Sequence, residues 1–260
     1  FSSYVSLDDL DAHWLQAGDE LLFSVDRRHE TIVVQVEGSF NGPSRFTVPR
    51  DARLMELLDS IPVDPQLADV DSVSIRRKSV EQRQRESLDE SLKRLETAYL
   101  GASSATVDES KIRIEEAKLI QDFVKRARQL EPSGRLVVAE GGRVRDTILQ
   151  DGDVITIPNR SDSIFVSGEV LVPQAMVYQD RQSVDDYIRR AGGFTDRANK
   201  RDILLARQSG EVVAADEVRP RPGDEILVLP EIPTKNLELA KTLTQILYQL
   251  AVATKVALDL

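Results

Sequence analysis

Histidines and paired carboxylates are the residues of this sequence that point first toward catalysis. The chain has two histidines, His13 and His29, and their spacing fits neither a zinc site nor a catalytic triad. Asp185 and Asp186 are adjacent, but neighbouring helical residues point in different directions, and acids at a helix start also stabilise the helix dipole. We therefore predict no catalytic residue and no enzyme.

Two glycine clusters, Gly38–Gly42 and Gly192-Gly193, are the segments closest in composition to a nucleotide-binding loop. Neither has the lysine and hydroxyl spacing of a P-loop, and neither belongs to a strand-GxGxxG-helix unit. Cysteine is absent, which removes disulfides, thiolate metal sites and nucleophilic thiols. The sequence thus predicts no cofactor and no metal.

Composition limits the remaining classes of protein. With 260 residues, of which 41% are hydrophobic, the chain can fill two or three small domains that each have a core. A net charge of -10 argues against a nucleic-acid partner. The start at Phe1 lacks the regions of a signal peptide, so we expect a segment of a longer protein.

A Gly-Asp phrase followed by an apolar run occurs three times, at Gly18-Asp19, Gly152-Asp153 and Gly223-Asp224. Glycine permits a tight turn with positive φ, aspartate bonds the nearby backbone, and the apolar run supplies a buried strand. The second and third runs stop at Pro158 and Pro230, which cannot donate to a sheet. Each phrase therefore predicts the closing strand of a structural unit.

The last two units also open alike. Ile32–Gly38 and Ile164–Val170 are strand patterns that run into a turn with glycine. A second short strand follows in each, and then a short helix with apolar residues at helical spacing, at Leu54–Leu58 and Val184–Ile188. Strand, strand, helix, strands is a β-grasp order, so the fold class is α+β with tandem β-grasp domains.

A charged stretch at about 79–131 interrupts the first of these units. On each side of Gly101–Ala105, apolar residues recur every three or four residues, which is helical spacing. Thr106 and Glu109 have capping-box spacing, so the stretch predicts a helical hairpin. We favour a solvated hairpin inserted in a loop. The alternative is an arm that docks a neighbouring subunit or partner.

The last unit carries residues that match a known family. Gly168-Glu169, a proline turn at Pro173, a helix with Asp186, the pair Gly192-Gly193 and the final Gly223-Asp224 occur in this order. The arrangement resembles the SLBB domain of bacterial outer-membrane polysaccharide export proteins, the OPX or Wza-like family. It covers 164–230 closely and 32–158 loosely, and Gln174 stands where the family has a second turn glycine. An inserted hairpin and a terminal helix are also similar to GfcC, a periplasmic capsule accessory protein.

The expected domains follow from these boundaries. They are the end of a preceding SLBB repeat at 1–30, an SLBB-like β-grasp domain with the inserted hairpin at 31–160, an SLBB domain at 161–231 and an amphipathic helix at 232–260.

The C-terminal helix has one apolar face, formed by Leu239, Leu243, Ile246 and Leu250. Charged residues near both ends argue against a lone transmembrane span. Such a helix can pack on its own sheet, lie at an interface or join copies of itself around a pore. The family resemblance implies the last, a homo-oligomeric ring whose helices pass through the outer membrane.

The resemblance implies a passive conduit for capsular polysaccharide or exopolysaccharide in the periplasm and outer membrane of a Gram-negative bacterium. Its partners would be the polysaccharide, further copies of itself and an inner-membrane polysaccharide co-polymerase. The alternative is a monomeric GfcC-like accessory or glycan-binding protein. Candidate glycan contacts are Tyr178 and Phe194, which can stack on sugars, and Arg181 and Arg197, which can bond hydroxyls. Because aromatics are 5% of the chain, we favour core packing for the two rings and expect weak binding.

Overall fold

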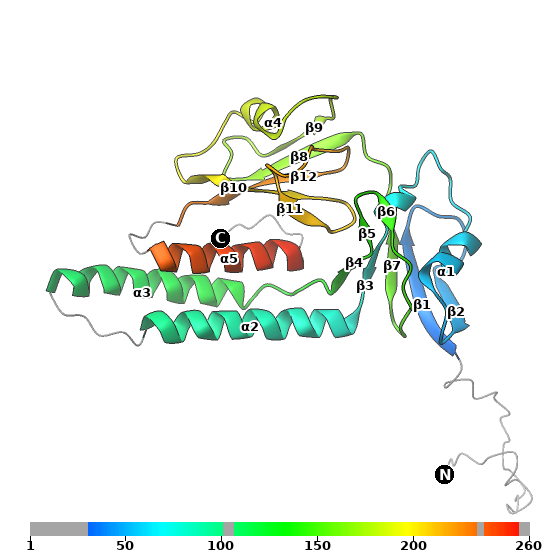
Figure 1. The fold of residues 1–260 in the computed structure, drawn as a ribbon, viewed down its shortest axis with the longest axis horizontal. Helices are drawn as coiled ribbons and strands as arrows, with labels where there is room; N and C mark the ends of the chain where they lie inside the picture. Colours follow the sequence, from blue (N-terminus) through cyan, green and yellow to red (C-terminus); the bar gives the residue numbers. More distant parts are fainter. Residues whose placement is uncertain (1–30, 101–106, 233–236, 255–260) are drawn as a thin grey trace, which may run out of the picture.

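The computed structural model describes residues 31–100, 107–232 and 237–254, which form two sheet units and a layer of helices (Figure 1). The expected tail of a preceding repeat, 1–30, lies outside the described residues. Each unit is built on a five-stranded mixed sheet with one short helix. The α+β class predicted from the sequence is confirmed.

The first unit has the strand order β2-β1-β7-β3-β4, with β1 and β7 parallel and the other neighbours antiparallel. Alternate residues of β1 are buried, which places one face of the sheet on a core shared with α1. Its elements are β1 (Thr31–Gly38), β2 (Arg45–Pro49), α1 (Leu54–Ser60), the 3₁₀ turn η2 (Val70–Ser72), β3 (Ser74–Arg76), β4 (Arg135–Val137) and β7 (Val154–Ile157), with a small hairpin of β5 (Ala139–Glu140) and β6 (Arg143–Val144).

The second unit repeats this topology. Its order, β9-β8-β12-β10-β11, has a parallel central pair, β8 and β12, flanked by antiparallel neighbours. The elements are β8 (Ser163–Gly168), β9 (Gln174–Val177), α4 (Val184–Arg190), β10 (Ala198–Ala206), β11 (Val212–Ala214) and β12 (Glu225–Pro230). The two units are therefore structural repeats, related strand by strand.

A glycine ends the first strand of each unit, beside the closing strand. Gly38 pairs with Ile157 and has φ 101°, and Gly168 pairs with Val228 and has φ 79°. A Cβ on Gly38 would lie 2.0 Å from the carbonyl oxygen of Ile157, and one on Gly168 would lie 2.1 Å from that of Val228. Only glycine fits this close crossing of two backbones.

The Gly-Asp phrase opens the closing strand in both units. The Asp153 carboxylate accepts the backbone N–H of Gln150, and the Asp224 carboxylate accepts that of Arg221. The carbonyl of each aspartate also accepts a backbone N–H from the first strand of its unit. The aspartates thus close the turn and join it to the sheet.

Two long helices, α2 (Lys78–Leu100) and α3 (Val107–Ala127), lie between β3 and β4 of the first unit. In the second unit a short turn at 207–211 connects the equivalent strands β10 and β11. The insertion therefore replaces a tight connection and leaves the strand order intact.

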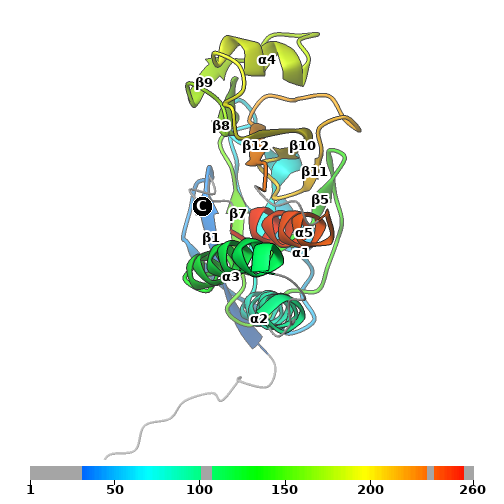
Figure 2. The same cartoon turned by 90° about the vertical axis from the view of Figure 1, so that its left-hand side faces the viewer.

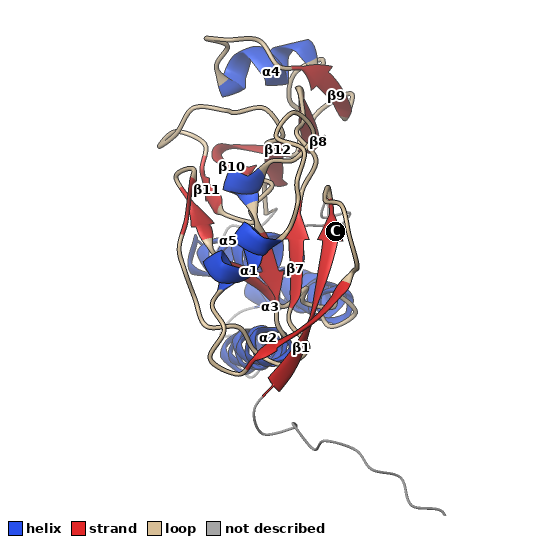
Figure 3. Ribbon diagram, turned by 90° about the vertical axis from the view of Figure 1, so that its right-hand side faces the viewer, coloured by secondary structure: helices blue, strands red, loops and turns tan. Residues whose placement is uncertain are grey.

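The C-terminal helix α5 (Leu237–Thr254) packs between α2–α3 and the second sheet (Figures 1 and 2). One side forms a core with Leu92 of α2 and Phe123 of α3, while Ala251 contacts the outer face of β10 and β12. The short helix α4 covers the opposite face of that sheet (Figure 3). Because β12 is covered on both faces, Ile226–Leu229 is buried throughout.

In the part of the chain that the structure describes, no helix combines the length and the apolar character that crossing a membrane requires.

We expect Gly168→Ala to destabilise the protein more than Gly193→Ala. Both glycines have positive φ, so both substitutions carry a left-handed strain of about 1–2 kcal/mol. A Cβ at Gly193 meets open space, whereas one at Gly168 meets the Val228 carbonyl oxygen and must separate β8 from β12. Urea unfolding of both variants measures the difference, and equal losses in the free energy of unfolding would contradict it.

Candidate functional site

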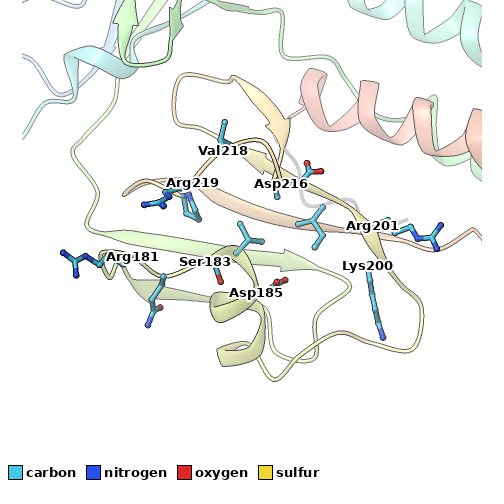
Figure 4. Close-up of a pocket in the computed structure, with 13 residues that line it drawn as sticks. Arg181, Ser183, Asp185, Lys200, Arg201, Asp216, Val218 and Arg219 are labelled. Atoms are coloured by element: carbon cyan, nitrogen blue, oxygen red, sulfur yellow. The ribbon is translucent and has the colours of Figure 1, made fainter.

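A half-open hollow of about 590 Å³ lies on the second unit, where α4 begins beside β10 and the loop after β11 (Figure 4). We call it the basic groove. Its charged lining residues are Arg181, Asp185, Lys200, Arg201, Asp216 and Arg219. They come from three chain segments that the sheet brings together.

The start of α4 fixes one wall of the groove. Ser183 caps the helix by accepting the backbone N–H of Asp186, and the Asp186 carboxylate accepts the backbone N–H of Ser183 in return. Arg181, two residues earlier, has φ 68°, a conformation that non-glycine residues rarely adopt. The tight turn into α4 therefore places the Arg181 side chain at the groove in a strained backbone geometry.

The groove carries four basic and two acidic side chains, an excess of two positive charges in a chain of net charge -10. Among the described residues, Arg181, Arg201 and Arg219 form no ion pair and no side-chain hydrogen bond. Arg181 and Arg219 lie at one end and Lys200 and Arg201 at the other (Figure 4). The two ends can therefore attract successive negative charges of an extended ligand.

The four predicted glycan contacts do not form one site. Arg181 lines the groove. Tyr178 and Phe194 are half-buried and pack against the core of the second unit, although the Lys200 ammonium lies 5.7 Å from the centre of the Phe194 ring. Arg197 lies outside the groove, 3.8 Å from a carboxylate oxygen of Glu169.

The residues of the SLBB-like motif hold the loops beneath α4. Glu169 accepts a short hydrogen bond from the Thr195 hydroxyl. Gly192 has φ 86°, and a Cβ there would lie 3.1 Å from Leu171, in the turn that also contains Pro173. The backbone N–H of Gly193 donates to the carbonyl of Ile188 and ends the helix.

Sequence reasoning missed Lys200, Arg201, Asp216 and Arg219. The consecutive pair Lys200-Arg201 in an acidic chain was the available signal. Its relation to Arg181 and Arg219 depends on the pairing of β10 with β12, which spacing along the chain does not reveal.

Asp224, the second residue of the last Gly-Asp phrase, is 3% exposed. Burial raises the pKa of its carboxyl to about 6, partly opposed by the hydrogen bond from the Arg221 backbone and by the charges of Arg207 and Arg221. Its counterpart Asp153 is paired with the Arg77 guanidinium. In the described part of the chain, no cluster of three or more His, Cys, Asp or Glu side chains is arranged to hold a metal ion.

Residues 163–216, which contain most of the basic groove, match the family model of the SLBB domain. The chain therefore carries an SLBB domain, as the motif from Gly168 to Asp224 predicted, and it is similar to polysaccharide transport proteins. Over all 260 residues it is 39% identical to two Escherichia coli proteins, each described as polysialic acid transport protein KpsD. The chain spans 46% of the length of each of these relatives.

We expect Asp224→Asn to change how stability depends on pH. The folded state holds the Asp224 proton more tightly than the unfolded chain, so this carboxyl stabilises the fold below about pH 4 and loses that contribution as the pH rises to about 6. The introduced asparagine does not ionise, so the variant does not lose stability as the pH rises from about 4 to about 6. Over this range its free energy of unfolding relative to wild type should rise by up to about 3 kcal/mol.

The matched variant Asp153→Asn should lower the free energy of unfolding at neutral pH, whereas Asp224→Asn should raise it. The change at Asp153 leaves the Arg77 guanidinium, whose side chain is 11% exposed, without its anionic partner, at a cost of about 3–5 kcal/mol. Urea unfolding at several pH values compares the two variants. An Asp224→Asn curve parallel to that of wild type at every pH would refute the assignment.

Proposed function

We propose that this chain is a non-enzymatic component of polysaccharide export and that the basic groove contacts an acidic glycan in transit. The observation that carries the proposal is the set of unpaired basic side chains at both ends of the groove. The two E. coli relatives are described as transporters of polysialic acid, a polyanion, which supports an acidic cargo.

The form of the groove suits a brief contact. Its guanidinium groups are exposed, and ion pairs between exposed charges are weak and are screened by salt. A conduit must release its cargo at each step, so weak contacts serve it better than a closed pocket. Lys200 beside the Phe194 ring adds one place where a sugar face can approach both a charge and an aromatic surface.

The assembly we propose is a homo-oligomeric ring in the periplasm of a Gram-negative bacterium, joined to an outer-membrane exit and supplied by an inner-membrane polysaccharide co-polymerase. In this proposal the face of Leu239, Leu243, Ile246 and Leu250 contacts membrane or neighbouring copies. These four side chains are buried among α2, α3 and α5 in the single chain. That role therefore requires α5 to leave this packing when the ring assembles.

A second candidate is a monomeric periplasmic accessory protein similar to GfcC. The packing of α5 back onto the hairpin and the second sheet favours it, because the apolar face of the helix is then covered without a partner. The two candidates differ in oligomeric state.

Titration with a polysialic acid oligomer, followed by NMR, tests the groove. We expect saturable, salt-sensitive shifts at residues 181–185 and 215–219, with a dissociation constant in the millimolar range, and much smaller shifts with a dextran oligomer. Arg181→Gln combined with Arg219→Gln should weaken binding about tenfold, since each lost charge contributes up to about 1 kcal/mol. Arg189→Gln, the same change on α4 outside the groove, serves as the control, and equal weakening by it would refute the site.

Mass measurement of the full-length protein in mild detergent tests the assembly. A large, closed oligomer is expected for the export ring, because heterologous contacts between identical chains close into rings. A monomer at all protein concentrations would exclude the ring and leave the accessory role.

A further inference from the structure

Each of the two sheets has two edge strands, and helix side chains protect one edge of each. The edges are β2 and β4 in the first sheet and β11 and β9 in the second. The carbonyl of Arg135 in β4 accepts a 3.5 Å hydrogen bond from the Gln84 side chain of α2. The carbonyl of Val212 in β11 accepts one from the Tyr248 hydroxyl of α5. The other two edges, β2 and β9, lie away from α2, α3 and α5 (Figure 1).

The ladder between β1 and β2 shows which backbone groups of the β2 edge point outward. The Val36 N–H donates to the carbonyl of Ser44, so these two residues are a hydrogen-bonded pair. Bonded and non-bonded pairs alternate along antiparallel strands, so Arg45 and Thr47 turn their N–H and C=O groups away from β1. The β2 edge therefore offers two donors and two acceptors.

The β9 edge has the same arrangement. The Tyr178 N–H donates to the carbonyl of Asp162, so the outward backbone groups of β9 are those of Ala175 and Val177. The strand carries no charged residue, and Val177 is 64% exposed. Within the described part of the chain, no side chain or loop bonds the outward backbone groups of either edge. An uncharged, unprotected edge of this kind is a template for pairing with another strand.

The outward groups of the two edges match in an antiparallel register. With Ala175 opposite Thr47, Val177 lies opposite Arg45. The two pairs then form four backbone hydrogen bonds, and each outward N–H and C=O group at these positions has a partner. On the exposed face, the aliphatic stem of Arg45 can cover Val177.

Prolines end this ladder at the same place on both strands. Pro173 precedes β9, Pro49 is the last residue of β2, and the register puts them opposite each other. Neither has an N–H, so hydrogen bonding stops on both strands at once. On the other face Met176 lies opposite Phe46, and each packs on the core of its own unit. The short helices α1 and α4 then lie on the same side of the joined sheet.

We propose that β9 of one copy of this chain pairs antiparallel with β2 of the next copy, so that their two five-stranded sheets join into one. The contact rests on the proposed homo-oligomeric ring and specifies the surfaces that meet in it. It is heterologous, because one chain contributes its second unit and its neighbour contributes its first, and contacts of this kind close into rings. Pairing of β9 with β9 of a second copy closes a dimer and leaves β2 unpaired.

Disulfide cross-linking of the full-length protein tests the contact, because these 260 residues contain no cysteine. Ala175→Cys combined with Thr47→Cys places the two Cα atoms of neighbouring copies about 5.5 Å apart, within the range of a disulfide. Oxidation should give a ladder of dimers, trimers and larger species on a denaturing gel. The unsubstituted protein, oxidised in parallel, shows the background.

The matched control moves one cysteine to the neighbouring strand. Val33 is 45% exposed and pairs with Thr47 from β1, one strand further from the contact. In Ala175→Cys combined with Val33→Cys, the Cα atoms of neighbouring copies lie about 10 Å apart, too far for a disulfide. This variant should stay uncross-linked.

A proline at the β9 edge gives a second measurement. The N–H of Ala175 points away from β8, so Ala175→Pro keeps the ladder within the unit and removes one donor of the proposed contact. The protein concentration at half-assembly should rise roughly tenfold. Ala175→Ser keeps the donor and should assemble like wild type. Urea unfolding of both variants checks that the unit stays folded.

The ring and the strand contact fail in different ways. A ring without cross-linking between the two introduced cysteines, or with equal cross-linking of the Val33→Cys control, overturns the strand contact and leaves the ring. Assembly of Ala175→Pro at the wild-type concentration does the same, as do dimers as the sole product of complete oxidation. A monomer at all protein concentrations overturns both.

Discussion

The parallel pairing of the first and last strands is the constraint on which each unit depends. Gly38 and Gly168 allow the first strand to end against a carbonyl of the closing strand, a crossing that any side chain would block. The other strands of each unit flank this central parallel pair, and the short helix and any insertion lie in the connections between strands. This explains why one repeat can hold a long helical hairpin in place of a five-residue turn and keep the same strand order.

The hairpin α2–α3 and the terminal helix α5 join the two units through a shared apolar core. α2 and α3 are inserted in the first unit, α5 follows the second, and the three share an apolar core that also reaches the outer face of the second sheet. Relative motion of the units would have to break this core, so the basic groove keeps a fixed position relative to the first unit.

Much of this organisation can be predicted from the sequence, because it depends on local chemistry. The Gly-Asp phrases mark turns that glycine and aspartate impose by themselves, and the apolar spacing near Leu54 and Val184 indicates short helices that need a sheet to cover. The charged groups of the sites are different. Arg219 lies beside Arg181 only because β12 returns between β8 and β10.

The burial of α5 sets how often the helix is free. Five of its apolar side chains, at Leu239, Leu243, Ile246, Leu247 and Leu250, are at most 2% exposed, and exposing them to water costs roughly 10 kcal/mol in total. At that cost about one molecule in ten million has the helix undocked at equilibrium. The docked helix is therefore the dominant form of the single chain, and a partner that needs the helix undocked must supply a comparable free energy by binding it.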